Sequence, residues 1–113
     1  MNMESAPKGV LRRIALARTE EVAEGEVIRV EAEGEAFAIY HLPDGDFRVT
    51  TDVCTHGVAS LSEGWIVDDC QIECPLHGGC FDIRTGAAVS PPCEVDIAVY
   101  PVTIEGGVVC IDL

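Results

Sequence analysis

The sequence predicts an all-β domain of short antiparallel strands, on three observations. Segments with the spacing of an amphipathic helix are scarce. Turn signals recur along the chain, which contains 11 Gly and 6 Pro. The runs between these signals are short, and 48% of all residues are hydrophobic, as in a globular protein. Since 113 residues can bury one hydrophobic core, we expect a single domain over residues 1–113.

Four strands are expected in the first half of the chain, over residues 10–17, 26–32, 35–41 and 47–52. Residues 19–23 have the pattern of a short capped helical turn. Glu33-Gly34 joins the second and third strands as a hairpin turn. Residues 43–46, Pro-Asp-Gly-Asp, turn the chain into the fourth strand.

Later elements follow the same logic. Residues 79–83 are expected to be extended and 84–86 to form a turn. Residues 95–103 and 108–111 are expected to form a closing hairpin across Glu105-Gly106-Gly107.

Two motifs stand out, Cys54-Thr55-His56-Gly57 and Cys74-Pro75-Leu76-His77-Gly78. Each offers one cysteine and one histidine, followed at once by glycine, whose missing Cβ lets the backbone approach a bound group. Residues 58–73 are long enough for each motif to lie in its own hairpin loop, so that two loops can close on one inorganic centre. This arrangement predicts a metal site and suits a cluster better than a single ion.

Thiolates are soft donors that bind zinc or iron–sulfur centres, and imidazoles raise the potential of iron relative to thiolates. A mixed set of two cysteines and two histidines therefore indicates a tuned electron carrier. A structural zinc module is the alternative, although zinc fingers usually pair Cys with Cys and His with His, whereas this chain interleaves them.

The motifs C-T-H-G and C-P-L-H-G resemble the Rieske [2Fe-2S] signature. By this resemblance Cys54 and Cys74 bind one iron of a single cluster, and His56 and His77 bind the other. The strand order resembles the Rieske fold, with antiparallel sheets in a base domain, residues 1–52 and 93–113, and a cluster-binding subdomain inserted at about residues 53–92. Residues 90–93, Ser-Pro-Pro-Cys, occupy the position of the proline loop that packs over the cluster in this family.

High-potential members of the family carry an additional cysteine in each motif, where this chain has Ala59 and Leu76. They also carry a serine and a tyrosine whose hydroxyls bond to sulfur, where this chain has Gly79 and Phe81. Because missing donors disfavour the reduced cluster, we expect a potential on the order of −150 mV. The motifs, the length, the acidity and the C-T-H-G start together resemble the Rieske-type ferredoxin component of bacterial multicomponent aromatic-ring-hydroxylating dioxygenases.

The resemblance implies a soluble one-electron carrier without a catalytic site of its own. It would pass electrons from a flavin-containing, NADH-dependent ferredoxin reductase to the Rieske domain of a terminal oxygenase. Docking would use an apolar collar formed by Val58, Leu76, Pro91 and Pro92. The alternative function is that of a small Rieske subunit in an enzyme complex similar to nitrite reductase.

Composition limits the partners and the location. The chain has 20 Asp and Glu against 7 Lys and Arg, a formal charge of −13, which excludes nucleic acid and anionic membranes as partners. We see neither a secretory signal nor an apolar run of about 18 residues. We therefore expect a cytoplasmic protein in which the remaining cysteines, Cys70, Cys80, Cys93 and Cys110, are reduced. We also expect a monomer, as is natural for a soluble carrier with an exposed tip.

Two other side chains are expected to lie outside the metal site. Trp65, the sole Trp, is expected to be a packing anchor. His41 lies outside both motifs and is expected to pack or to lie at the surface.

Overall fold

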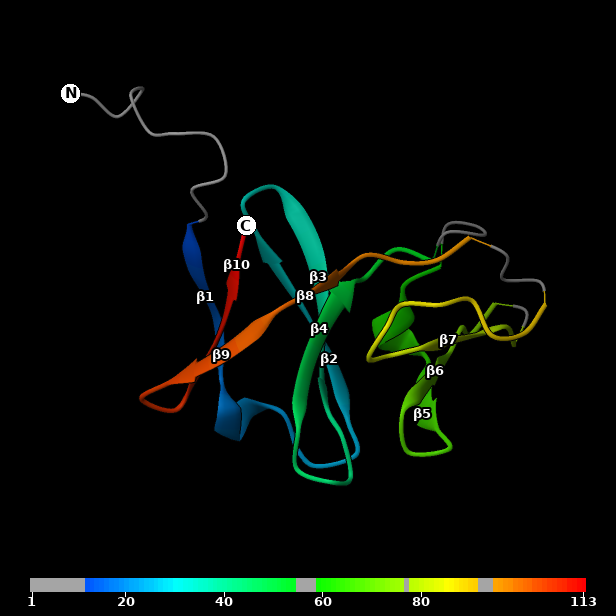
Figure 1. The fold of residues 1–113 in the computed structure, drawn as a ribbon, viewed down its shortest axis with the longest axis horizontal. Helices are drawn as coiled ribbons and strands as arrows, with labels where there is room; N and C mark the ends of the chain where they lie inside the picture. The colour runs from blue at the N-terminus through cyan, green and yellow to red at the C-terminus, as the bar shows by residue number, and fades with distance from the viewer. Residues whose placement is uncertain (1–11, 55–58, 77, 92–94) are drawn as a thin grey trace.

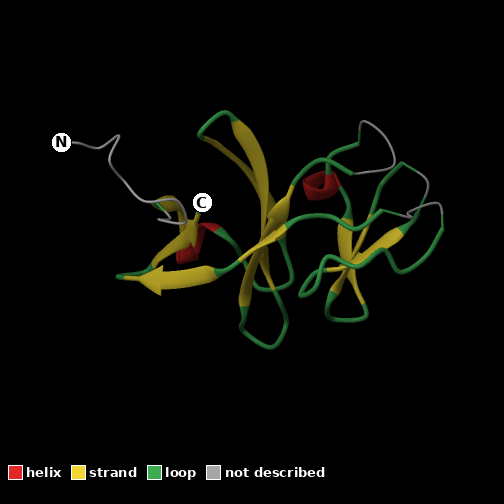
Figure 2. Cartoon of the chain, turned by 45° about the horizontal axis from the view of Figure 1, so that its top comes forward, coloured by secondary structure: helices red, strands yellow, loops and turns green. Residues whose placement is uncertain are grey.

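A computed structural model describes residues 12–54, 59–76, 78–91 and 95–113 of the chain. These residues form three antiparallel sheets, with strand orders β1-β10-β9, β2-β3-β4-β8 and β5-β6-β7 (Figure 1). The strands are β1 (Arg13–Arg18), β2 (Val27–Ala32), β3 (Glu35–His41), β4 (Phe47–Thr51), β5 (Trp65–Val67), β6 (Gln71–Glu73), β7 (Cys80–Asp82), β8 (Val99–Tyr100), β9 (Val102–Glu105) and β10 (Val108–Asp112). Two 3-10 turns, η2 (Thr19–Glu21) and η3 (Leu61–Glu63), are the helical elements of this part of the chain (Figure 2). The all-β prediction is confirmed.

The hairpin between β2 and β3 turns at Glu33 and Gly34, as predicted. Both residues have left-handed backbones, with φ of 54° and 79°, and the strands pair from Ala32 and Glu35 outward. Consecutive positive φ angles match the right-handed twist of the flanking strands, which is why such turns favour hairpins. The predicted turn at residues 43–46 is also present, because the N–H of Leu42 donates to the carbonyl of Asp46 at 2.8 Å.

Strand β3 contributes side chains to both hydrophobic cores, because successive side chains of a strand point to opposite faces. Phe37 and Ile39 lie in one core, which also holds Val109 and Ile111 of β10. The intervening side chains lie in a second core, with members from β3, its end and the segment that follows β4: Ala38, Tyr40, Leu42, Cys54, Leu61, Ile72, Cys74, Phe81, Ile83 and Ile97. The four-stranded sheet is therefore buried on both faces at β3.

The sheet β5-β6-β7 lies at one end of the molecule, across the four-stranded sheet from β1, β9 and β10, in both views (Figures 1 and 2). Ile66, Ile72 and Phe81 are paired across its strands and point toward the second core. Trp65 pairs with Glu73 on the other face and is 50% exposed. The prediction that Trp65 is a packing anchor is wrong, because alternation along β5 directs the core contact to Ile66.

The predicted strand over residues 95–103 is wrong in extent. Two short strands, β8 and β9, lie on either side of Pro101, and residues 95–98 precede them without strand pairing. Proline lacks the N–H that a sheet ladder requires. The two strands accordingly join different sheets, with β8 beside β4 and β9 beside β10.

The first predicted strand begins in residues 10–11, which lie outside the described residues, and it appears as β1. The helical turn that follows is present as η2, where the Glu21 carboxylate accepts the N–H of Arg18 at 3.0 Å. In the described ranges, no helix is long and apolar enough to cross a lipid bilayer.

Candidate metal centre

Cys54 and Cys74 are both fully buried, with exposed fractions of 1% and 0%. They come from different segments, one after β4 and one after β6, yet both belong to the second core together with Leu61, Ile72 and Phe81. The structure therefore places in one core the two cysteines that the sequence predicts as ligands.

The loop that begins at Cys54 is closed by its own backbone. The N–H of Cys54 donates to the carbonyl of Ala59 at 3.0 Å. The residues just outside this bond, Val53 and Ser60, form an antiparallel bridge. Cys54 is thus held in place by pairing between residues 53–54 and 59–60.

The loop that begins at Cys74 is closed in the same way. The N–H of Cys74 donates to the carbonyl of Gly79 at 2.8 Å, and the flanking residues Glu73 and Cys80 pair across β6 and β7. The expectation that each motif occupies the loop of its own hairpin therefore agrees with the closure of both loops.

Gly78 adopts a left-handed backbone with φ of 78°, and its N–H donates to the carbonyl of Cys74 at 3.1 Å. A residue with a Cβ is strained in this conformation, so glycine allows the second loop to turn back toward Cys74. The backbone conformation gives a direct reason for a glycine at the end of this motif.

The histidines of both motifs, His56 and His77, lie outside the described residues, as do Gly57, Val58, Pro92 and Cys93. Their assignment as ligands, and the role of the collar and proline-loop members among them, stay predictions. Within the described ranges, no group of three or more Cys, His, Asp or Glu side chains is placed to hold a metal ion elsewhere.

The third histidine, His41, has a packing role, as predicted. Its Nδ1 lies 2.9 Å from the carbonyl oxygen of Val22, and its ring stacks on Phe47 with centroids 4.1 Å apart. Cys70, Cys80 and Cys110 are not joined by disulfide bonds.

Two residues near the motifs make contacts that the sequence did not predict. Ser90 accepts the N–H of Cys80 through its Oγ at 3.1 Å, and the adjacent Val89 N–H donates to the carbonyl of Cys80 at 2.8 Å. Asp52 is a buried carboxylate two residues before Cys54. The sequence placed Asp52 at the end of a predicted strand and Ser90 at the start of the proline-loop position. It did not reveal the contact of either residue, because each contact joins separate segments of the chain.

The described donors fit the sulfur side of an iron–sulfur cluster. Two thiolates in an apolar core are costly unless a cationic centre compensates them. An oxidised [2Fe-2S] core supplies a charge of +2, which balances two thiolates when the remaining ligands are neutral imidazoles. The buried, matched positions of Cys54 and Cys74 therefore suit this group.

Comparison with known proteins also indicates an iron–sulfur protein. The Rieske [2Fe-2S] domain family matches residues 12–101. The chain is 48% identical, over 88% of its length and 85% of the relative, to the ferredoxin component of the p-cumate 2,3-dioxygenase system of Pseudomonas putida. It is 45% identical, over 82% of its length and 88% of the relative, to the ferredoxin component of the naphthalene 1,2-dioxygenase system of Pseudomonas aeruginosa.

The solved structure of the Sphingomonas yanoikuyae B1 ferredoxin superposes with a TM-score of 0.84 at 48% identity, over 90% of this chain and 99% of that one. A nitrite reductase small subunit from Mycobacterium tuberculosis superposes with a TM-score of 0.81, over 92% of this chain and 96% of that one, but at 18% identity it shows a shared fold alone. The Rieske fold is thereby confirmed, and the family carries one [2Fe-2S] cluster. Two matched cysteine loops on this fold, together with the family match over most of the chain, show that the protein belongs to the Rieske [2Fe-2S] domain family.

Proposed function

We propose that this chain is the ferredoxin of a multicomponent aromatic-ring-hydroxylating dioxygenase system. It would accept one electron from a flavin-containing, NADH-dependent reductase and deliver it to the Rieske domain of the terminal oxygenase. The observation that carries the proposal is the pair of matched, buried cysteine loops in a chain 48% identical to a named dioxygenase ferredoxin.

We assign Cys54 and Cys74 to one iron of the cluster and His56 and His77 to the other. Burial of both cysteines in one core supports the first half of this assignment. The histidine half rests on the two motifs, each of which places a histidine before a glycine. When bound, the cluster supplies a site that gains and loses one electron without making or breaking a bond in a substrate.

The protein around the cluster must hold its position while the charge changes. The hydrogen bonds that close both loops, from Cys54 to Ala59 and from Cys74 to Gly79, fix the backbone at each cysteine. Phe81 is completely buried in the same core and excludes water from the inner side. A rigid and dry inner side lowers the reorganisation that accompanies each transfer.

We also propose the division into a base domain, residues 1–52 and 93–113, and a cluster-binding insertion at about residues 53–92. It is supported by the sheet β5-β6-β7, which is formed by Trp65–Val67, Gln71–Glu73 and Cys80–Asp82, all within the insertion. A cytoplasmic, monomeric protein is part of the same proposal, and size-exclusion chromatography of the purified protein tests the monomer.

Partner docking would be brief and would use a small surface, because the carrier must separate after each transfer. Leu76, in the second loop, is 48% exposed, and Pro91 is also exposed. A solved complex of reduced oxygenase and oxidised ferredoxin in carbazole 1,9a-dioxygenase contains a ferredoxin 39% identical to this chain, with a TM-score of 0.80 over 88% of this chain and 91% of that one. That structure supports an oxygenase as the acceptor.

The test is reconstitution of NADH-driven turnover from purified reductase, oxygenase and this protein. Turnover should depend on this protein and should stop when Cys54 or Cys74 is replaced by Ser. Binding to a sirohaem protein, with no support of any aromatic-ring oxygenase, would instead favour the nitrite reductase alternative. A colourless protein with one zinc would contradict both functions.

A further inference from the structure

Asp52 anchors the segment that leads into the first cysteine loop. It follows the last residue of β4, is completely buried and lies two positions before Cys54. Its N–H donates to the carbonyl of Ala36 at 3.0 Å, and its carbonyl accepts the N–H of Leu61 at 2.7 Å. The backbone of Asp52 thus joins the four-stranded sheet to the start of η3.

The carboxylate of Asp52 is held unequally at its two oxygens. Oδ1 accepts the N–H of Ser62 at 2.8 Å. Oδ2 is buried without a hydrogen-bond partner, and it lies 3.2 Å from Nε of Arg29. Among the described residues, this ion pair is the interaction that stabilises the charge on Oδ2.

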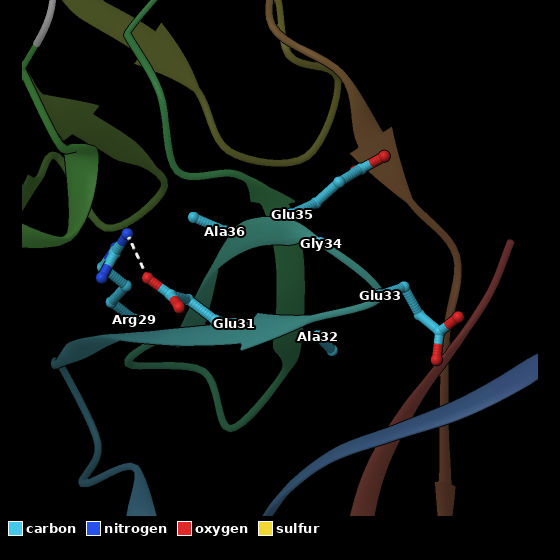
Figure 3. A pocket seen from close by; sticks show the side chains of 7 residues that line it. All are labelled: Arg29, Glu31, Ala32, Glu33, Gly34, Glu35 and Ala36. Atoms are coloured by element: carbon cyan, nitrogen blue, oxygen red, sulfur yellow. Dashed lines mark ion pairs between the residues drawn. The ribbon is translucent and has the colours of Figure 1, made fainter.

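The two members of this pair differ in their access to water. The Asp52 side chain is 1% exposed, whereas the Arg29 side chain is 48% exposed. Arg29 is also shared with Glu31, whose carboxylate lies 2.6 Å from its Nη2 at the rim of an open pocket of about 410 Å³ (Figure 3). Solvent and Glu31 screen the cation, while the anion remains desolvated, so the pair leaves a net negative field inside the protein.

Tyr40 is the member of the cysteine-bearing core whose pKa is raised in part by Asp52. Tyr40 belongs to the same core as Cys54 and Cys74, and its hydroxyl is hydrogen-bonded to Oγ1 of Thr50 at 2.8 Å. Burial is the main cause that raises the pKa of Tyr40 above its ordinary value; the hydrogen bond with Thr50 lowers it, and the negative charge of Asp52 raises it.

We propose that Asp52 and Arg29 together set the reduction potential of the cluster. Reduction adds one electron, and hence one negative charge, to a cluster whose proposed ligand Cys54 follows this buried anion by two residues, so Asp52 opposes it. Arg29 offsets part of this effect. The inference rests on the proposed ligands, and it assigns a tuning role to two residues that bind no iron in that proposal.

The test is the midpoint potential of the cluster in three variants, measured by redox titration. Asp52→Asn keeps an acceptor oxygen for the N–H of Ser62 but removes the charge, so the potential should shift to a more positive value. Arg29→Gln removes the cation and leaves the anion, so the potential should shift to a more negative value. Arg29→Lys keeps the charge and should restore much of the wild-type value.

Arg48→Gln is the matched control. Arg48 also lies on the four-stranded sheet and pairs with an aspartate, Asp46, at 2.8 Å, but that aspartate is in the exposed turn before β4. Loss of the Arg48 charge should leave the reduction potential of the cluster unchanged. This control separates a local effect from the change of net charge that both arginine variants share.

Opposite shifts in Asp52→Asn and Arg29→Gln would support the proposal. Equal shifts in one direction would overturn it, because a merely loosened loop alters water access in the same sense in both variants. An unchanged potential in Arg29→Gln would overturn it too, and that variant decides the question even if Asp52→Asn does not fold. Iron and sulfide content, measured on each sample, shows whether the cluster is present and so tests the proposed ligands separately. Failure of the proposed function would appear instead as cluster-loaded wild-type protein that does not support NADH-driven turnover of an aromatic-ring oxygenase.

Discussion

The backbone N–H of Cys80 donates a hydrogen bond to Oγ of Ser90 at 3.1 Å. This bond ties β7, the strand that follows the second cysteine loop, to the segment that leads into Pro91. Because Cys80 is buried, its N–H would lose its partner if the hydroxyl were removed. Ser90 therefore fixes the start of the predicted proline loop against the cluster-binding sheet.

Replacement of Ser90 by Ala should lower the free energy of unfolding by about 1 kcal/mol, the usual effect of one lost buried hydrogen bond. It should also speed the loss of iron to a chelator, since the segment above the second loop is released. Urea denaturation and the rate of bleaching measure the two effects. Ser90→Thr keeps a hydroxyl and should behave more like wild type; equal behaviour of the Ala variant and wild type would rule out this role.

Gly64 is required for the approach of the η3 segment to β6. A Cβ at this position would lie 1.9 Å from the carbonyl oxygen of Glu73, the residue before Cys74. Gly64→Ala should therefore cost about 3 kcal/mol, in the range of overpacked cores, and should reduce the iron content. Thermal or urea unfolding measures the loss.

Gly45→Ala provides the comparison for this clash. Gly45 has a left-handed backbone with φ of 95°, but a Cβ there would meet nothing within 4 Å. Its substitution should cost only the backbone strain, about 1 kcal/mol. If Gly64→Ala proves no more destabilising than Gly45→Ala, the clash with Glu73 is not real.

The hairpin turn between β2 and β3 can be improved. Glu33 has φ of 54°, a conformation that asparagine tolerates better than glutamate, and Gly34 already follows it. Glu33→Asn should raise the free energy of unfolding by about 0.5 kcal/mol, even though it removes the exposed ion pair with Arg12, which is worth little. Glu33→Gln removes the same charge without the backbone preference and should not stabilise; a gain of equal size in both variants would contradict the explanation.

Leu76 is expected to contact the oxygenase. Its side chain is half exposed in the second loop, next to the predicted ligand His77. Leu76→Ala should reduce the efficiency of electron delivery about tenfold, equivalent to about 1.4 kcal/mol of interface energy, while the reduction potential stays unchanged. Stopped-flow measurement of oxygenase reduction tests this.

Ile104→Ala is the control for exposed apolar surface. Ile104 is similarly exposed, but it lies in β9, in the sheet that does not adjoin the cysteine loops. Its replacement should leave the rate unchanged. If both variants slow the transfer equally, docking through the second loop is excluded.

Much of the base sheets could be predicted because local signals determine them. Glu33-Gly34 marks a hairpin, and β3 agrees with its predicted range at both ends. The split at Pro101 was missed because the apolar pattern continues through it, and only the change of sheet reveals the break. Strands β5 and β6 were missed since three residues each are too few to show a period.

The candidate site, too, could be predicted only in part from the sequence. Cys54 and Cys74 could be predicted as ligands because their motifs require unusual residue types at fixed spacing. Asp52 and Ser90 could not, because their importance depends on contacts with Arg29 and Cys80 that the chain order does not reveal. Burial of a charge and pairing across segments are properties of the folded chain.

The most direct test of the account is the composition and ligation of the metal centre in protein labelled with ¹⁵N-histidine. We predict iron and acid-labile sulfide in equal amounts, two of each per chain, and an electron paramagnetic signal after reduction that is coupled to two histidine nitrogens. A single zinc, an absence of sulfide, or a reduced cluster without histidine coupling would contradict it.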